Sequence, residues 1–145
     1  MATERSAQVT WQGSLMEGSG EIHEVPSGAF GPLAVSWTAR SEDDSGGKTS
    51  PEELIAAAHA ACFAMALSNG LAKAGHAPER LETSATVTFV PGTGITKSEL
   101  TVVGSVPGLD EAAFVEAAEE AKEACPVSGA LKNNVELTLD ARLQS

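Results

Sequence analysis

The sequence Ser-Pro-Glu-Glu-Leu-Ile-Ala-Ala-Ala-His-Ala-Ala-Cys-Phe-Ala-Met-Ala-Leu, residues 50–67, decides the fold of this chain. Its apolar run covers residues 54–67 and is interrupted only by His59. A run of this length is too short to span a bilayer and is typical of a helix buried in a protein core. We therefore expect the rest of the chain to pack around this segment.

Both ends of the expected helix carry recognisable signals. Thr49 or Ser50 can cap it, Pro51 suits the first helical position, and Glu52 with the following glutamate complements the positive end of the helix dipole. Gly75 is a typical residue just beyond a helix C-terminus. The predicted helix thus runs from residue 50 to about residue 74.

Alternating apolar and polar residues predict strands elsewhere, with glycine and proline marking the turns. The segment 81–90, a Pro-Gly-Thr-Gly turn and the segment 97–106 predict a hairpin. Asp110 can cap a second helix that ends at residue 124, and residues 127–131 predict a short helical turn. The other predicted strands are 7–11, 21–25, 33–39 and 135–143, and residues 41–48 form a polar loop. The fold class is α+β with mainly antiparallel strands around two core helices.

Length and composition narrow the possible classes of protein. A chain of 145 residues fits one domain, residues 1–145, whose core needs no disulfide or metal for stability. Twenty acidic against nine basic residues give a net charge of −11, which argues against binding to nucleic acid or to an anionic membrane surface. The polar N-terminus lacks the apolar core of a signal peptide, so we expect a cytoplasmic protein.

Two cysteines, Cys62 and Cys125, are the candidates for chemistry. Cys62 lies within the apolar helix, and Cys125 ends the second helix, just before Pro126. We expect the mostly apolar helix face that carries Cys62 to be buried. At helical spacing this face also includes Ile55, Ala58, Met65, Ala66 and Asn69. In a reducing cytoplasm thiols stay free, and the disulfides that do form are usually transient and catalytic or redox-sensing. Two interpretations stay open at this point. The cysteines are inert core residues, or they are a nucleophile and the thiol that resolves it.

Cys62 would need help to react, because it lies about three turns into its helix, too far for the dipole to lower its pKa. A nearby cation must then stabilise the thiolate, and Arg40, at the end of a predicted strand, is a candidate. Its competing role is that of a solvated surface charge. Glu52 either complements the helix dipole or turns inward to hold an arginine. His59 and Cys62 have no further ligands at convincing spacing, so no metal site is predicted.

The helix 50–67, together with Ala-Cys-Pro-Val-Ser-Gly-Ala-Leu at residues 124–131, closely resembles the OsmC/Ohr family of thiol-dependent hydroperoxide reductases. The segment 51–63 places the chain nearer the OsmC (osmotically inducible protein C) branch. The resemblance covers essentially the whole chain. It implies an intertwined homodimer with two active sites at the subunit interface and no bound cofactor.

The resemblance also implies roles for individual residues. Cys62 would be the peroxidatic thiol and Cys125 the resolving thiol. Glu52 matches the glutamate of the family motif. The Ohr branch takes its arginine from the glycine-rich hairpin near the N-terminus, where this chain has Met-Glu-Gly-Ser-Gly at residues 16–20 and no arginine. The OsmC-like branch points to Arg40 instead.

The implied function is reduction of organic hydroperoxides, and more weakly of hydrogen peroxide, through a Cys62 sulfenic acid and a disulfide to Cys125. An external dithiol, of lipoyl type or another small dithiol, would reduce the disulfide again. Two alternatives remain. One is a non-catalytic ligand-binding or redox-sensing module of the same fold. The other is a general thiol–disulfide oxidoreductase, which normally has a Cys-x-x-Cys motif that this sequence lacks.

Overall fold

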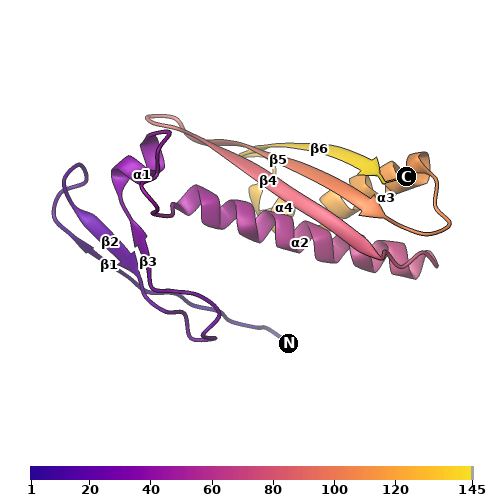
Figure 1. Cartoon of the computed structure of the whole chain (residues 1–145), viewed down its shortest axis with the longest axis horizontal. Coiled ribbons are helices and arrows are strands. Elements are labelled where there is room, and N and C mark those ends of the chain that lie inside the picture. The colour runs from indigo at the N-terminus through magenta and orange to yellow at the C-terminus, as the bar shows by residue number, and fades with distance from the viewer. Residues whose placement is uncertain (145) are drawn as a thin grey trace. The chain divides into compact units, whose positions relative to one another are not determined.

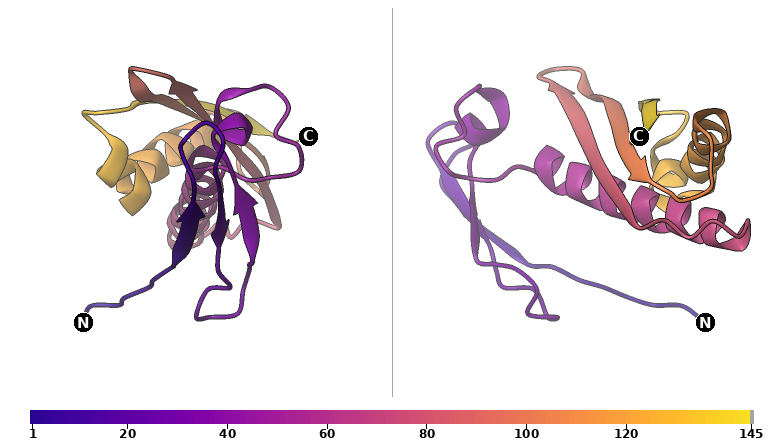
Figure 2. Two further views of the ribbon diagram at one scale, coloured as in Figure 1. Left: turned by 90° about the vertical axis from the view of Figure 1, so that its left-hand side faces the viewer. Right: turned by 45° about the vertical axis from the view of Figure 1, so that its right-hand side comes forward.

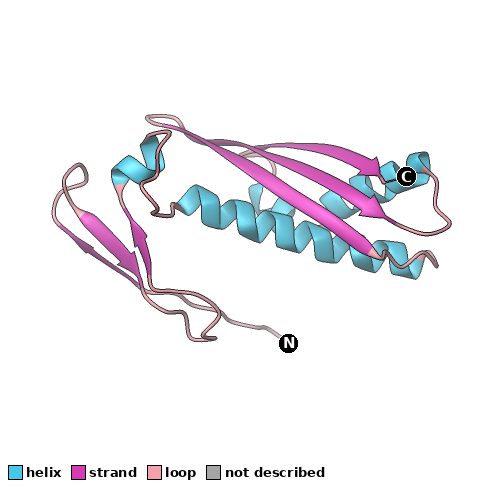
Figure 3. Ribbon diagram, in the orientation of Figure 1, coloured by secondary structure: helices cyan, strands magenta, loops and turns pink. Residues whose placement is uncertain are grey.

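The computed structural model describes residues 1–144, which form two compact units that divide between Pro51 and Glu52. The expectation of one domain over residues 1–145 stays a prediction. Figure 1 labels the elements, and Figure 3 distinguishes helices from strands. The N-terminal unit contains β1 (Val9–Gln12), β2 (Ser19–Ile22), β3 (Leu33–Val35) and α1 (Trp37–Ser41). The remaining elements are α2 (Pro51–Lys73), β4 (Arg80–Val90), β5 (Gly94–Ser105), α3 (Glu111–Ala124), α4 (Pro126–Leu131) and β6 (Glu136–Leu143).

The sheet of the C-terminal unit has the strand order β4-β5-β6. β4 and β5 form the predicted antiparallel hairpin, with a register shift between Thr88 and Phe89. β6 joins β5 in parallel, from Lys97 opposite Glu136 to Gly104 opposite Leu143. The parallel pairing follows from the α3–α4 connection, because strands of the same direction require a crossover between them.

One face of β5 packs against the helices of this unit (Figure 2). Its alternate residues from Ser98 to Val106 are buried, and Leu100 and Val102 belong to the same hydrophobic cluster as the buried side chains of α2 and α3. Side chains two residues apart on a strand share a face. The two helices therefore lie on the same side of the sheet.

The buried face of α2 differs from the sequence prediction. His59, Phe63, Leu67 and Leu71 are buried at successive four-residue spacings and form the stripe toward the sheet. The face predicted to be buried together with Cys62 included Ala58, Met65 and Asn69, all of which are exposed. The prediction was wrong because a helix that is apolar on nearly every side does not reveal which side meets the core.

α3 follows the prediction at its start and along its core face. The Asp110 carboxylate accepts a hydrogen bond from the Ala113 N–H at 2.8 Å, so it caps the helix as expected. Phe114, Ala118 and Ala121 are the buried residues of this helix. Small residues at two of these positions let the backbone of α3 approach the sheet closely.

In the N-terminal unit, β1, β2 and β3 form an antiparallel three-stranded sheet. The predicted strand over residues 33–39 is only half right, because β3 ends at Val35 and α1 begins at Trp37. The Ser36 hydroxyl accepts a hydrogen bond from the Ala39 N–H at 3.1 Å and starts this helix. A capping serine was overlooked within an alternating pattern, and Arg40 consequently lies on a helix rather than after a strand.

α2 is the one described helix that is long and apolar enough, by length and composition alone, to cross a membrane. The sequence argument considered only the run 54–67, which is shorter than the helix that forms. A core helix passes the same test, and α2 contributes Phe63, Leu67 and Leu71 to the hydrophobic core.

Candidate functional site

Cys62 packs against the buried cluster that contains Cys125, and the two thiols are near enough to shift each other's pKa. Cys62 lies on α2 and is partly exposed, whereas Cys125 lies between α3 and α4 with 1% of its surface exposed. Both are free thiols. The structure thus brings together the two cysteines that are 63 positions apart in the sequence (125 − 62 = 63).

The local sequence holds Cys125 at a sharp junction between two helices. Its N–H donates to the Ala121 carbonyl at 2.9 Å and so completes the last turn of α3. Its carbonyl accepts from the Gly129 N–H at 3.0 Å and begins α4. Pro126 occupies the first position of α4, where it costs no hydrogen bond. Hydrogen bonds of both helices therefore hold the backbone of Cys125 in place and fix the point from which its side chain extends.

The two thiols differ in acidity. Burial raises the pKa of Cys62, and the contact with Cys125 raises it further, outweighing the opposite effect of the Val127 N–H. Burial also acts to raise the pKa of Cys125, but the Ser128 N–H, Cys62 and the Ser128 hydroxyl together lower it. The N–H groups at the start of α4 lower this pKa although the Cys125 side chain makes no capping hydrogen bond to them. The start of α4 thus supplies groups that lower the pKa of Cys125.

A buried histidine links three elements next to this pair. His59 is fully buried on α2, and its Nδ1 lies 2.7 Å from the Ser98 hydroxyl of β5. Its Nε2 lies 2.8 Å from the hydroxyl of Ser128 on α4. Both serines are themselves buried. Burial lowers the pKa of His59, so the ring is neutral near pH 7.

The other two predicted site residues belong to different units. Arg40 is half-buried in the last turn of α1, in the N-terminal unit. Glu52 lies in the first turn of α2 and is buried, with 7% of its surface exposed. Glu53, the next residue, is exposed. Of the two glutamates, Glu52 is thus the buried one, and its role as the partner of an arginine stays a prediction.

The two hydrogen-bonded serines were not predicted from the sequence. His59 was expected only as a possible metal ligand, whereas both ring nitrogens are engaged by hydroxyl groups. Among residues 1–144 no cluster of three histidine, cysteine or acidic side chains is arranged to hold a metal ion. Two signals could have found the network: His59 is the only polar residue of the apolar run, and Ser128 follows Cys125 by three residues.

Comparison with known proteins places the chain in a family. Residues 42–140 match the family described as OsmC-like protein. The chain is 40% identical, over the full length of both, to peroxiredoxin OsmC of Escherichia coli strain K12. It is 33% identical over 102 residues to an organic hydroperoxide resistance protein of Xanthomonas axonopodis, covering 65% of this chain and 67% of that protein.

Solved structures with the same fold cover nearly all of the chain. The organic hydroperoxide resistance protein OhrB of Bacillus subtilis superposes with a TM-score of 0.64 at 26% identity, over 94% of this chain and 98% of that one. An OsmC-like protein of Mycoplasma pneumoniae superposes with a TM-score of 0.74 at 13% identity, over 100% of both. The sequence match, the shared α+β fold and the paired cysteines agree: this chain belongs to the OsmC-like protein family.

Proposed function

We propose that this protein is a thiol-dependent peroxidase that detoxifies organic hydroperoxides, with Cys62 as the peroxidatic and Cys125 as the resolving residue. The observation that carries the proposal is the packing of the two free thiols in one cluster, one partly exposed and the other buried. A peroxide can approach the partly exposed Cys62, and the buried cysteine is near it. The names of the relatives, a peroxiredoxin and hydroperoxide resistance proteins, support the same class of activity.

The reaction proceeds in three steps. The Cys62 thiolate attacks the terminal oxygen of the hydroperoxide, the O–O bond breaks, and an alcohol leaves after taking up a proton while Cys62 becomes a sulfenic acid. The Cys125 sulfur then attacks the oxidised sulfur, so an S–S bond forms and the S–O bond breaks, releasing water. An external dithiol reduces the disulfide by two thiol exchanges and is itself oxidised to a disulfide. A compact lipoyl-type dithiol suits this last step.

The nucleophile needs a positive charge. Since burial and Cys125 both raise the pKa of Cys62, little thiolate would exist at neutral pH without a cation. We assign this role to the Arg40 guanidinium, following the family resemblance, with the carboxylate of Glu52 orienting its plane through a bidentate pair. An inward-facing Glu52 supports the assignment.

The surroundings of Cys62 favour an organic substrate. Alanine side chains dominate its part of α2, including the exposed Ala61 and the partly exposed Ala66. Transfer of an alkyl or aryl group from water to an apolar environment is favourable, whereas hydrogen peroxide has no apolar group to transfer. We infer that the protein acts in the cytoplasm, where a low-molecular-weight or protein-bound dithiol keeps it reduced.

The test is a peroxidase assay with a bulky organic hydroperoxide and with hydrogen peroxide, using a dithiol as reductant. The organic substrate should turn over faster. Cys62→Ser should abolish turnover, because a serine hydroxyl is not ionised near neutral pH. Cys125→Ser should consume about one equivalent of peroxide per chain and then stop as a sulfenic or over-oxidised thiol.

Unaltered steady-state activity in the Cys62→Ser protein would refute the proposed nucleophile. Unchanged thiol titres after one equivalent of peroxide would instead favour the non-catalytic binding module, in which the two cysteines only pack. Both measurements use the full-length chain, and its folding is checked by circular dichroism.

A further inference from the structure

The buried chain Ser98–His59–Ser128 is not used by the peroxidase cycle as described above. Its two hydrogen bonds, 2.7 Å and 2.8 Å long, connect β5, α2 and α4 inside the protein. Burying polar groups costs free energy unless each is hydrogen-bonded, and a merely structural position would be filled more cheaply by an apolar side chain. The chain therefore calls for a functional explanation.

Ser128 points this chain toward the resolving cysteine. Cys125 is the N-cap residue of α4, and Ser128 occupies the third position of that helix. Ser128 therefore lies three residues after Cys125, in the first turn of the helix that Cys125 begins, and the Gly129 N–H closes this turn on the Cys125 carbonyl at 3.0 Å. The Ser128 hydroxyl and N–H are near enough to the Cys125 sulfur to help lower the pKa of this thiol. The buried chain thus extends from Ser98 to the site of disulfide formation.

The direction of the hydrogen bonds follows from the neutral imidazole, which has one donor and one acceptor nitrogen. If the Ser98 hydroxyl donates to Nδ1, then Nε2–H donates to Ser128, whose own proton is left to point at the Cys125 sulfur. In the other tautomer the Ser128 proton points to Nε2, and Cys125 must keep its proton to donate to the serine oxygen. Each tautomer of His59 matches one protonation state of Cys125.

We propose that His59 is a positioning residue for Cys125: through Ser128 it aims a hydroxyl proton at the sulfur and so holds this thiol ready to form the disulfide. The inference rests on the proposed function, in which Cys125 resolves the sulfenic acid. The thiolate attacks the Cys62 sulfur, the S–O bond breaks, and the leaving hydroxide takes the proton that Cys125 had lost, giving water. When Cys125 is protonated again after reduction, the tautomer of His59 reverses.

Few other titratable groups lie near the hydrogen-bonded residues Ser98, His59 and Ser128. Cys62 faces Cys125 from α2. A cavity of about 220 Å³ next to Ser128 is lined by Lys122, Glu123 and Lys132. Lys122 is paired with Glu119 at 3.2 Å. On β5, Lys97 and Glu99 flank Ser98 and pair with each other at 3.4 Å. Because Lys122 and Lys97 are already paired with glutamates, the polar contact of His59 on the side of Cys125 is the Ser128 hydroxyl, whose proton it can orient.

The equilibrium test uses full-length protein carrying Cys62→Ser, so that Cys125 is the only thiol. Its ionisation is followed by the ultraviolet absorbance of the thiolate against pH, which needs no reagent to reach the buried sulfur. Adding Ser128→Ala or His59→Leu should raise the midpoint by about one pH unit, because a hydrogen bond to an ionised group is lost. His59→Gln, which can still donate to Ser128, should raise it by less than half as much.

The kinetic test uses the chain with both cysteines and one equivalent of organic hydroperoxide, with disulfide formation followed by quenching and mass spectrometry. Ser128→Ala should slow this step about tenfold at a pH below both midpoints, since the thiolate fraction falls tenfold per unit. Phe63→Leu, one helical turn from His59 on the same buried face, is the matched control for altered packing and should leave the midpoint unchanged.

Three results would overturn the inference: unchanged midpoints in Ser128→Ala and His59→Leu, a shift in Ser128→Ala alone, or an equal shift in Phe63→Leu. If His59→Leu fails to fold, Ser128→Ala and His59→Gln decide the matter, and a midpoint equal to the parent's in Ser128→Ala overturns it. The titration requires no peroxide. A protein without peroxidase activity would thus refute the proposed function, while the midpoints separately test His59.

Discussion

At the scale of single residues, the site contains an apparent contradiction. The thiol proposed to attack the peroxide has the raised pKa, and the thiol proposed to resolve it has the lowered one. Both directions describe the C-terminal unit with its own hydrogen bonds. These pKa directions fit the proposed cycle if a cation lowers the pKa of Cys62. The pKa of Cys125 is already lowered by groups of its own unit.

Arg40→Ala should therefore shift the dependence of peroxide reduction on pH. A cation next to a thiolate stabilises the charged form and lowers its pKa, so removing it should raise the pKa of Cys62. The rate below the new midpoint should fall by an order of magnitude or more, with the plateau displaced to higher pH. Initial rates of peroxide consumption measure this. Arg80→Ala, which removes an exposed arginine paired with Glu82, is the control.

A profile identical to the parent's in Arg40→Ala would mean that another cation activates Cys62. An equal displacement in Arg80→Ala would point to a general effect of net charge instead.

Replacing His59 should change how stability depends on pH. Burial lowers the pKa of His59 in the folded protein, so the unfolded chain takes up a proton first as the pH falls below about 6.5. The free energy of unfolding should then decrease, by at most about 1.4 kcal/mol per pH unit, until the folded pKa is reached. His59→Gln should lack this decrease, whereas His76→Gln should retain it. Urea unfolding at several pH values compares the three slopes.

Parallel slopes for the parent and His59→Gln would show that the buried imidazole does not protonate on unfolding in this range.

At the scale of elements, β5 organises the C-terminal unit. Its buried face offers a hydroxyl at Ser98, large aliphatic side chains in the middle and no side chain at Gly104. A Cβ at Gly104 would lie 2.5 Å from Phe114 Cζ and 3.2 Å from Leu81 Cδ2. The glycine thus makes room for the fully buried ring of α3, and this contact sets the distance of that helix from the sheet.

Gly104→Ala should consequently destabilise the protein by about 1–3 kcal/mol, because the buried ring of Phe114 has no free space to move into. Gly70→Ala is the matched control: it lies in α2 with no atom within 4 Å of the added Cβ. That change should stabilise the protein by about 0.4–1 kcal/mol. Denaturant unfolding of both variants measures the difference, and equal stabilities would contradict the packing argument.

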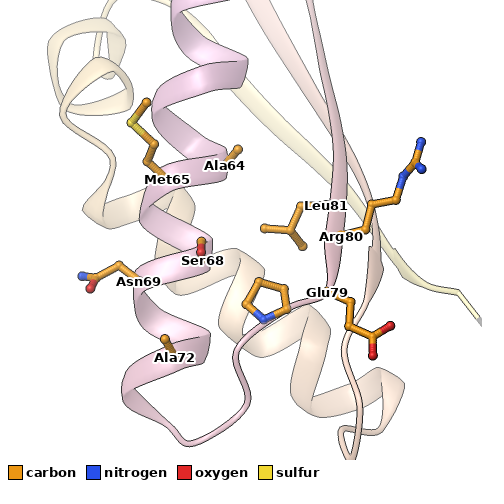
Figure 4. A pocket seen from close by; sticks show the side chains of 9 residues that line it. Ala64, Met65, Ser68, Asn69, Ala72, Glu79, Arg80 and Leu81 are labelled. Atoms are coloured by element: carbon orange, nitrogen blue, oxygen red, sulfur yellow. The ribbon is translucent and has the colours of Figure 1, made fainter.

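At the scale of the whole molecule, much apolar surface is left exposed. Only 22% of the most apolar 18-residue window of α2 is buried, and Met65 on this helix is 72% exposed. Figure 4 shows Ala64 and Met65 beside a cavity of about 680 Å³, with Leu81 pointing from β4 toward α2. In β1 all four residues are exposed. Exposed apolar surfaces of this extent usually mark interfaces.

We therefore predict an obligate homodimer that covers this face of α2, as the family resemblance also implies. Met65→Glu should weaken the dimer, because it places a charge in an apolar interface. Equilibrium sedimentation at micromolar concentration measures the mass. Lys73→Gln, an exposed change at the end of α2 that alters the net charge by the same single unit, is the control for net charge. A folded and active monomer of the unsubstituted chain would rule out the arrangement.

Much of the fold could be predicted because its signals are local. The hairpin of β4 and β5, the Asp110 cap and the short helix after Pro126 each depend on neighbouring residues, and each is found as expected. The prediction failed at α1, where Ser36 caps a helix inside an apparently alternating strand. It failed again at α2, where a nearly uniform apolar sequence carries no information about its buried side.

The sequence by itself determined the α+β class, the family and the identity of the two cysteines, because these reside in residue types and their spacing. Only the tertiary structure decided that Cys62 packs against the cluster of Cys125, that Cys125 is buried with a lowered pKa, and that His59 joins Ser98 to Ser128. The physical reason is that acidity and hydrogen bonding depend on burial and on neighbours in space. Residues far apart in the chain become such neighbours only when α2, β5 and α4 pack together.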